Sequence, residues 1–219
     1  MTKVIPVGEA AAKLRDGMTV MFGGFMGCGN AHHVIQAIID AGVTDLTMIC
    51  NDASVPGYGV AKLVEHKRLR RLITSHVGLN PQVGVQMNAG ELEVELVPQG
   101  TLVERIRSGG AGLGGVLTPT GLGTPVAEGK PVVTVSGRDY LLEEPLRADV
   151  AVINGYRVDP AGNVWYRGDA RNFNPVMATA ADLVIVEADH LVGLGDITPE
   201  DVVTPSVLVD YIVEGGELP

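Results

Sequence analysis

Four glycines lie within seven residues of this sequence, between a short apolar run and a helical pattern. The apolar run is Val20–Phe22, the glycine loop is Gly23–Gly29, and apolar residues at helical spacing begin at Val34. Glycine has no Cβ, so a loop of this kind between a strand and a helix lets backbone amides approach an anion closely. Glycine clusters are also typical of a tight turn that binds nothing. The segment therefore predicts a strand, a turn and a helix, with an anion-binding loop as the functional hypothesis.

Apolar runs and helical patterns alternate along the rest of the chain. Nearly continuous apolar runs are typical of strands with both faces covered, and their alternation with helices is typical of a parallel sheet. We therefore expect one α/β domain, 1–219, with an open, mostly parallel sheet and helices on both faces. The glycine-rich stretch 108–129 is expected to be an ordered loop. Expected helices cover 9–14, 31–41, 58–65, 81–89, 101–107 and 178–181, and expected strands cover 18–22, 46–50, 71–75, 92–96, 150–153 and 183–186, with a hairpin of 131–135 and 138–142.

Composition indicates which kinds of ligand the chain can bind and in which compartment it is expected. The chain has 16 basic and 26 acidic residues, a net charge of −10, which argues against nucleic-acid binding but leaves a small anionic ligand open. No apolar run reaches the roughly 18 residues of a membrane span, and Met1–Pro6 lacks the apolar stretch of a signal peptide. The two cysteines, Cys28 and Cys50, have no metal-ligand or disulfide spacing. These features predict a cytoplasmic protein without a metal.

Two glycine patterns invite comparison with a dinucleotide site. Gly110–Gly115 matches G-x-G-x-x-G, but an expected helix precedes it and no helix follows, whereas the fingerprint needs a strand before and a helix after. The glycine loop has the right context but lacks the third glycine. Asp52 ends the next expected strand, where a ribose-binding acid would lie. A stand-alone nucleotide-binding enzyme, such as a nicotinamide-dependent oxidoreductase, therefore stays open as an alternative.

Several segments in order resemble one known family. The glycine segment 16–29 resembles the A (alpha) subunit motif of family I coenzyme A transferases, with the closest likeness to acetate/acetoacetate (3-oxoacid) CoA-transferases. The resemblance implies the CoA-transferase fold, which is Rossmann-like. The other segments that carry it are Asn51-Asp52, 90–102, 105–107 with 109–112, 118–121 and Ala170-Arg171-Asn172-Phe173-Asn174.

The resemblance implies that this chain is one subunit of a two-subunit enzyme. Such enzymes move coenzyme A between carboxylic acids: a glutamate carboxylate attacks the acyl-CoA thioester, and a covalent enzyme–CoA thioester follows. In two-subunit members this glutamate lies in a Ser-Glu-Asn-Gly motif of the beta subunit, and no such tetrapeptide occurs here. The implied partner is a beta subunit in an α2β2-like hetero-oligomer. The implied substrates are a short-chain acyl-CoA of acetoacetyl, acetyl or butyryl type and a carboxylic acid, with coenzyme A as substrate rather than a permanently bound cofactor. A non-catalytic stabilising subunit is the other alternative.

The resemblance also assigns candidate site residues. Gln99 would support the oxyanion, since an amide donor directed at developing charge stabilises it. Asn51 would lie near the cleft. The glycine loop would bind coenzyme A, with its amides exposed to the ligand, through Gly23, Gly24, Phe25, Met26, Gly27, Cys28 and Gly29.

Several other residues in and beyond the loop have their own interpretations. Ala31 stands where the family usually has proline, a residue that fits a helix start, so its absence is expected to loosen the junction or change what the loop admits. Cys28 precedes a helix, where a thiolate can be stabilised, or it only fills the loop. His32 and His33 lack a third ligand in sequence. The basic cluster 66–71 is expected to be a solvated face or an interface, with contact to coenzyme A phosphates as the alternative.

Overall fold

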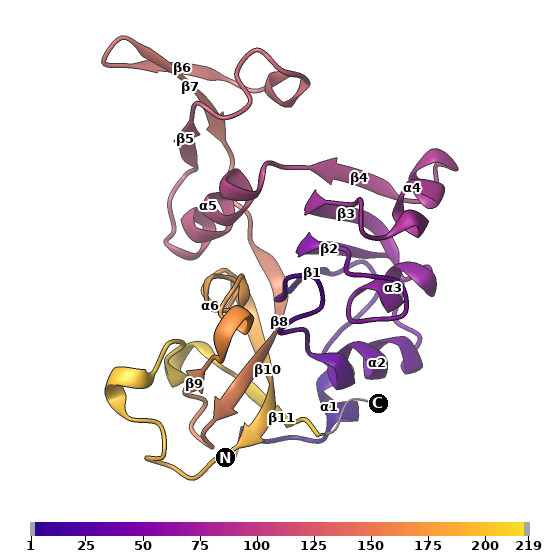
Figure 1. Ribbon diagram of the computed structural model, residues 1–219, viewed down its shortest axis with the longest axis vertical. Coiled ribbons are helices and arrows are strands. Elements are labelled where there is room, and N and C mark those ends of the chain that lie inside the picture. Colours follow the sequence, from indigo (N-terminus) through magenta and orange to yellow (C-terminus); the bar gives the residue numbers. More distant parts are fainter. Residues whose placement is uncertain (1–2, 217–219) are drawn as a thin grey trace.

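The computed structural model describes residues 3–216 and contains an eight-stranded sheet (Figure 1). The expected domain 1–219 includes Met1, Thr2 and 217–219, which lie outside the described residues. Seven strands pair in parallel in the order β11-β10-β8-β1-β2-β3-β4, and β9 pairs antiparallel with β8. The predicted open, mostly parallel sheet is therefore confirmed. The strands are β1 (Thr19–Phe22), β2 (Leu46–Asp52), β3 (Leu69–His76), β4 (Glu93–Leu96), β8 (Ala148–Val158), β9 (Val164–Trp165), β10 (Ala181–Leu191) and β11 (Tyr211–Glu214).

Helices cover both faces of this sheet, and each face has its own apolar core. Along β1, Val20 and Phe22 belong to the core under α1–α4, whereas Met21 between them belongs to the core under α5 and α6. This alternation follows from the two-residue period of a strand. In Figure 1, α2, α3 and α4 lie on one side of the strands and α5 and α6 on the other. The helices are α1 (Val7–Ala11), α2 (His32–Asp40), α3 (Ala61–Glu65), α4 (Pro81–Asn88), α5 (Gln99–Gly110) and α6 (Asn174–Met177).

One expected helix is wrong. The sequence predicts a helix over 178–181, but α6 ends at Met177 and Ala181 begins β10, where it pairs with Ala148 of β8. The alanines favour a helix locally, and pairing within the sheet overrides that preference. At 12 residues, α5 is the longest helix between residues 3 and 216, and no helix there is long and apolar enough to cross a membrane.

Two central strands are longer than expected. β8 and β10 each have 11 residues and pair along most of their length, with Asn154 of β8 opposite Glu187 of β10. The sequence predicts only their apolar centres, because the polar residues beyond them break the apolar pattern. These extensions place buried polar side chains beside the carboxyl end of β1.

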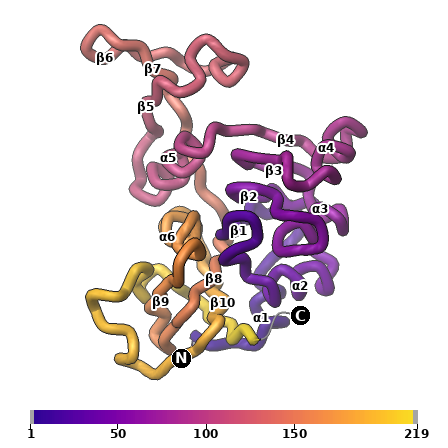
Figure 2. Tube along the Cα trace, in the orientation of Figure 1, coloured from indigo at the N-terminus to yellow at the C-terminus, as the bar shows by residue number. Residues whose placement is uncertain are grey.

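A second, three-stranded sheet stands away from the main sheet (Figure 2). The expected hairpin is present: β6 (Val132–Val135) and β7 (Arg138–Glu143) pair antiparallel around Ser136 and Gly137, which both have positive φ, as a two-residue hairpin turn requires. The stretch 108–129 is not only a loop, because it contains β5 (Val116–Thr118), which pairs with β7.

Ion pairs attach this small sheet to the main one. Glu143 at the end of β7 is 1% exposed, and its carboxylate lies 2.7 Å from Lys130 Nζ and 3.9 Å from Arg105 Nε on α5. Arg105 also pairs with Glu95 of β4 at 2.7 Å. Its guanidinium holds the pKa of the Glu95 carboxyl below the ordinary value, with Arg71 adding to the effect and outweighing the opposing effect of burial.

A carboxylate on β10 binds the first turn of α2. Ala31 occupies the N-cap position and its side chain makes no capping hydrogen bond. Instead the carboxylate of Glu187 on β10, 3% exposed, accepts a hydrogen bond from Val34 N at 2.9 Å and lies 3.0 Å from His33 Nδ1. Glu187 therefore satisfies a helix N-terminal donor at the junction where Ala31 replaces the family's usual proline.

We expect Glu187→Leu to lower the free energy of unfolding by about 1–3 kcal/mol, because it leaves the buried Val34 amide without an acceptor. Urea unfolding followed by circular dichroism measures this loss. Glu187→Gln keeps one acceptor oxygen and is the matched control, with a smaller loss. Equal stability of the leucine variant and the unsubstituted chain would contradict this account of the α2 start.

Candidate active site

The candidate residues meet at the carboxyl edge of the main sheet. The glycine loop follows β1, Asn51 and Asp52 end β2, and Gln99 begins α5 just beyond β4. Because β1 to β4 are parallel neighbours, their carboxyl ends lie at the same edge, where ligands bind in folds of this kind. The structure thus brings together the glycine loop, Asn51 and Gln99, the candidate site residues that the sequence singled out.

The glycine loop folds into a tight reversal. Phe25 and Cys28 exchange backbone hydrogen bonds of 3.0 and 2.9 Å, and the two residues between them, Met26 and Gly27, have φ of 51° and 85°. Two positive φ values in succession are what a two-residue reversal requires. The reversal leaves the side chains of Phe25 and Met26 41% and 48% exposed. The loop therefore offers two apolar side chains at the sheet edge.

Most loop amides are not exposed to a ligand, contrary to expectation. Their donors are already used inside the chain: Gly23 N to Val152 O, Gly24 N to Asn172 Oδ1, Phe25 N to Cys28 O, Met26 N to Asp52 Oδ2 and Cys28 N to Phe25 O. Each buried or half-buried amide needs such a partner. The loop is therefore a turn fixed by internal hydrogen bonds, and few of its backbone N–H groups are free to bind a ligand.

The glycines instead make room for two buried asparagine side chains. A Cβ at Gly24 would collide with the amide of Asn30, and a Cβ at Gly23 would collide with the amide of Asn174. Asn174 Nδ2 donates to Gly29 O at 3.1 Å, and a Cβ at Gly29 would lie 2.8 Å from that nitrogen. Close approach of side-chain amides explains these glycines better than anion binding does.

Asn172 clamps the loop from outside. Its Oδ1 accepts from Gly24 N at 3.1 Å and its Nδ2 donates to Cys28 O at 3.0 Å. Asn172 and Asn174 both belong to the segment 170–174, which the sequence singled out without indicating its partner. The structure shows that this segment supports the glycine loop.

A chain of hydrogen bonds joins the loop to Gln99. Asp52 Oδ2 accepts from Met26 N at 3.0 Å and from Asn51 Nδ2 at 2.7 Å. Asn51 Oδ1 in turn accepts from Gln99 Nε2 at 2.6 Å. A glutamine amide has two N–H groups, so one N–H of Gln99 is left to serve a ligand. Asp52 was not among the candidate catalytic residues, although it fixes the orientation of the Asn51 amide.

Two pockets share Phe25 and Gln99 in their linings. One, of about 360 Å³, is lined by Phe25, Met26, Asn51, Asp52, Ser75, His76, Leu79 and Gln99. The other, of about 380 Å³, is lined by Phe25, Gln99, Gly100, Val103, Asn172 and Phe173.

Asp52 contributes the only carboxylate among the described residues that line these two pockets. Its Oδ1 accepts from Ser54 N at 2.8 Å, and its Oδ2 accepts the two hydrogen bonds from Met26 and Asn51. Both oxygens thus accept hydrogen bonds from within the chain, and these bonds fix the orientation of the Asp52 carboxylate.

The surroundings of Cys28 and His32, two further candidates, shift the pKa values of their side chains. Burial raises the pKa of the Cys28 thiol, with Asp169 and Asp189 adding to the effect, so the stabilised thiolate considered from the sequence is wrong. His32 packs on the Tyr58 ring at 4.4 Å, and burial lowers its pKa, helped by Lys62 and His33. Residues 3–216 contain no cluster of three side chains suited to a metal ion.

The basic cluster 66–71 is largely engaged within the chain. Lys67 pairs with Glu91 at 2.8 Å, Arg68 donates to Ile39 O at 3.2 Å, and Arg71 pairs with Glu95 at 2.7 Å. These pairs leave little of the cluster for an anionic ligand.

The chain belongs to the coenzyme A transferase family. The family model described as Coenzyme A transferase matches residues 5–215. Within the family, the chain corresponds to alpha subunits of two-subunit enzymes. It is 50% identical over 216 residues to the acetate CoA-transferase subunit alpha of Escherichia coli strain K12, covering 99% of this chain and 98% of that one. It is 49% identical over 213 residues to the acetoacetyl-CoA:acetate/butyrate CoA transferase alpha subunit of Clostridium acetobutylicum, covering 97% and 98%.

A solved structure shares the fold. The acyl-CoA transferase from E. coli O157:H7, crystallised as a thioester complex with CoA, superposes with a TM-score of 0.87 at 20% identity. The match covers 98% of this chain and 47% of that one, so this chain spans about half the length of that protein. At this identity the likeness shows the fold alone.

We expect Asp52→Asn to disconnect the loop from Gln99, because an asparagine amide nitrogen cannot accept from both Met26 N and Asn51 Nδ2. The kcat of the complex with its partner subunit should fall roughly 10- to 100-fold, in line with about 1–3 kcal/mol for an unmet buried donor. The matched control is Asp149→Asn, since Asp149 accepts from Thr19 N at the start of β1, at the opposite edge of the sheet. A control that lost as much activity as Asp52→Asn would remove the special role of Asp52.

We expect the exposed Cys28 of the isolated chain to react slowly with iodoacetamide near neutral pH, because its raised pKa leaves little thiolate there. Its rate should keep rising above the pH at which an ordinary exposed thiol is ionised. Asp189→Asn should speed the reaction at fixed pH by removing a negative charge. Mass spectrometry measures the rate, with Cys28→Ser as the control for buried Cys50.

Proposed function

We propose that this chain is the alpha subunit of an enzyme that moves coenzyme A between a short-chain acyl-CoA and a carboxylic acid. Acetoacetyl-, acetyl- and butyryl-CoA are the proposed donors, and the names of the two relatives at 50% and 49% identity support them. The proposed nucleophile is a glutamate of the beta subunit. The alpha or A subunits named among the relatives imply such a partner, and the α2β2-like stoichiometry is part of the proposal.

The observation that carries this proposal is the hydrogen bond between Gln99 and Asn51 at a pocket whose one carboxylate among the described residues, Asp52, is hydrogen-bonded within the chain. An amide donor held in a fixed orientation suits an oxyanion that develops at a thioester carbonyl. The missing component is the nucleophile, which a partner subunit can insert at the open sheet edge. Amide donors on one chain and a carboxylate on the other make a complete acyl-transfer site.

Each candidate residue has a role in this scheme. Gln99 supports the oxyanion through its second N–H, and Asn51 positions Gln99. The glycine loop, Gly23–Gly29, contacts coenzyme A mainly through the exposed side chains of Phe25 and Met26, because most of its amides are engaged. Coenzyme A is a substrate here, with no resident cofactor or metal.

We treat 1–219 as a single domain, supported by one family model that spans 5–215. A cytoplasmic location is supported by two cysteines that form no disulfide.

Co-expression with a beta subunit that carries Ser-Glu-Asn-Gly tests the function directly. The purified complex should exchange coenzyme A between acetoacetyl-CoA and acetate or butyrate with ping-pong kinetics. A stable complex that exchanges nothing over a broad panel of acids would overturn the proposal. Calorimetric binding of NAD without binding of coenzyme A would favour the nucleotide-dependent alternative.

We expect Gln99→Ala to lower kcat of this complex by roughly 10²- to 10³-fold with a small change in KM, because an oxyanion donor acts mainly in the transition state. Gln82→Ala on the exposed start of α4 is the control and should keep full activity. If Gln99→Ala and Gly24→Asp both left activity unchanged in an intact complex, the chain would be a stabilising subunit rather than a contributor to the site.

A further inference from the structure

Aromatic and arginine side chains gather on the surface outside the candidate site, where β8, β9 and β10 end. We call this cluster the arginine–aromatic patch, and its members are Tyr156, Arg157, Trp165, Arg167 and His190. Arg167 and His190 are exposed, and the other three are half-buried. Aromatic residues make up only 4% of the chain, and Trp165 is its one tryptophan. A chain poor in aromatic residues thus places its largest side chain at the surface.

Ring contacts hold the patch in one arrangement. The Tyr156 ring meets the Trp165 ring edge-on at 5.6 Å between centroids and the His190 ring at 4.7 Å. Arg157 lies 4.6 Å from the centroid of the Trp165 ring. Arg167 lies 5.1 Å from that of Tyr156 and donates to its hydroxyl oxygen at 3.0 Å. These edge-on and cation–π contacts order the side chains in advance, so little conformational entropy is lost when a partner binds.

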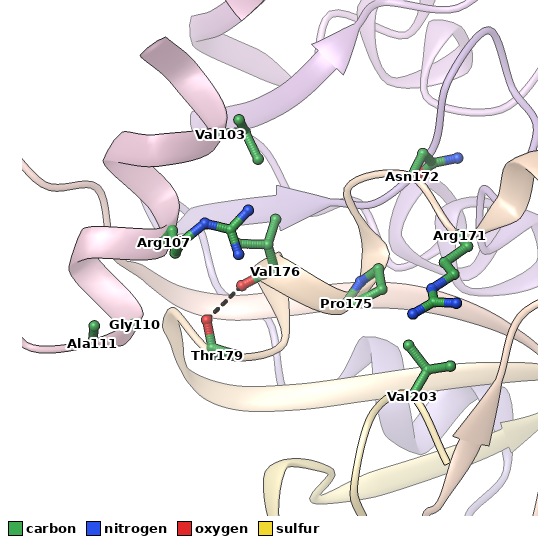
Figure 3. A pocket seen from close by; sticks show the side chains of 10 residues that line it. All are labelled: Val103, Arg107, Gly110, Ala111, Arg171, Asn172, Pro175, Val176, Thr179 and Val203. Carbon is green, nitrogen blue, oxygen red and sulfur yellow. Dashed lines mark hydrogen bonds between the residues drawn. The ribbon is translucent and has the colours of Figure 1, made fainter. Parts of the chain in front are cut away.

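The positive charge of this surface is not neutralised. No carboxylate within residues 3–216 forms an ion pair with Arg157, Arg167 or Arg171, and Arg171 follows at the end of the next turn. Arg171 lines a pocket of about 600 Å³, with Arg107 of α5 on the opposite wall (Figure 3). The residues that line this pocket in the described part of the chain include no carboxylate. Since the whole chain has a net charge of −10, these unpaired arginines favour a local partner surface that carries carboxylates.

The patch is continuous with the candidate site. β8 and β10 run parallel to β1, so their carboxyl ends lie at the sheet edge that carries the glycine loop. Asp169 and Asp189, which border the patch, both raise the pKa of the Cys28 thiol in that loop, so they lie near it. The segment 167–174 begins in the patch and ends at Asn174, which binds the loop. A protein seated on the patch would therefore also border the glycine loop.

We propose that the arginine–aromatic patch is a docking surface for the beta subunit, with Trp165 and Arg167 at its centre. Tryptophan, tyrosine and arginine are the residues that most often dominate the binding energy of protein interfaces. The matching surface of the beta subunit carries aspartate or glutamate opposite the arginines and an apolar face opposite Trp165. This inference rests on the proposed function, in which a partner supplies a carboxylate near Gln99, and adds the surface on which that partner is seated.

Dissociation of the purified complex on dilution, followed by analytical ultracentrifugation, tests the surface. Trp165→Ala should raise the Kd between the subunits roughly 10- to 100-fold, because it truncates the central aromatic contact. Trp165→Phe keeps a ring and should lose less. Arg167→Glu should also raise the Kd and should weaken its dependence on salt, because attraction between opposite charges is screened by salt and is lost in this variant. Arg167 is exposed, so this variant tests the surface even if Trp165→Ala fails to fold.

Lys13→Glu is the matched control. Lys13 lies 4.6 Å over the ring of Tyr211, the first residue of β11, so it forms the same kind of contact at the opposite edge of the sheet. This variant should leave the Kd unchanged. An increase in Kd as large as that of Arg167→Glu would show a general effect of charge and overturn the proposal. Circular dichroism of each variant shows whether it is folded.

A fluorine label reports on the patch directly. Because Trp165 is the one tryptophan, the full chain prepared with 5-fluorotryptophan has a single fluorine resonance. Unlabelled beta subunit should shift this resonance, and coenzyme A alone should not. An unchanged resonance in the assembled complex would overturn the proposal. A shift caused by coenzyme A alone would assign the patch to a ligand, and a shift caused by raising the concentration of this chain alone would assign it to a second copy; either result would also overturn it.

Subunit association and transfer of coenzyme A are measured separately, so the two proposals can fail separately. A complex that transfers no coenzyme A but whose Kd rises with Trp165→Ala and Arg167→Glu would support the docking surface and reject the proposed function. An active complex whose Kd is unchanged by both substitutions would reject the docking surface alone.

Discussion

The side chain of Asn174 is the contact on which the candidate site depends. It is fully buried, its Oδ1 accepts from Asn154 N on β8 at 3.0 Å, and its Nδ2 donates to Gly29 O and Ala170 O at 3.1 and 2.9 Å. One amide thus joins a central strand, the glycine loop and the segment before α6. Since a buried amide with unmet hydrogen bonds is costly, these three parts have to keep their relative positions.

This arrangement changes the physical meaning of the glycines. In a phosphate-binding loop, glycine lets backbone N–H groups surround an anion. Here it lets the amides of Asn30 and Asn174 approach the backbone, and most N–H groups are satisfied within the protein. The loop gains a fixed shape, and specificity passes to the side chains that project from it. A similar glycine pattern can therefore serve either binding or bracing, and only the partners of the amides distinguish the two.

The sequence predicted the parts of this structure that depend on local pattern. The run Val20–Phe22 and the spacing after Val34 were enough for β1 and α2, because each has one face or both faces in an apolar core. The Ala178–Ala181 prediction failed because strand pairing with β8 decides that segment. Gln99 and Asn51 are 48 residues apart, so their hydrogen bond follows from strand order. The family resemblance named both as site candidates but did not pair them. The engaged amides, the raised pKa of Cys28 and the capping role of Glu187 all depend on distant residues that no local pattern encodes.

The ion pairs that attach the small sheet also connect it mechanically to the site. Lys130 and Glu143 belong to the projecting part of the chain, and Glu143 lies beside Arg105 in the middle of α5. Gln99 is the first residue of that helix. A displacement of the small sheet has to break these pairs or carry α5 with it. The buried charge of Glu143 thus links the placement of the projecting sheet to that of the helix that carries Gln99.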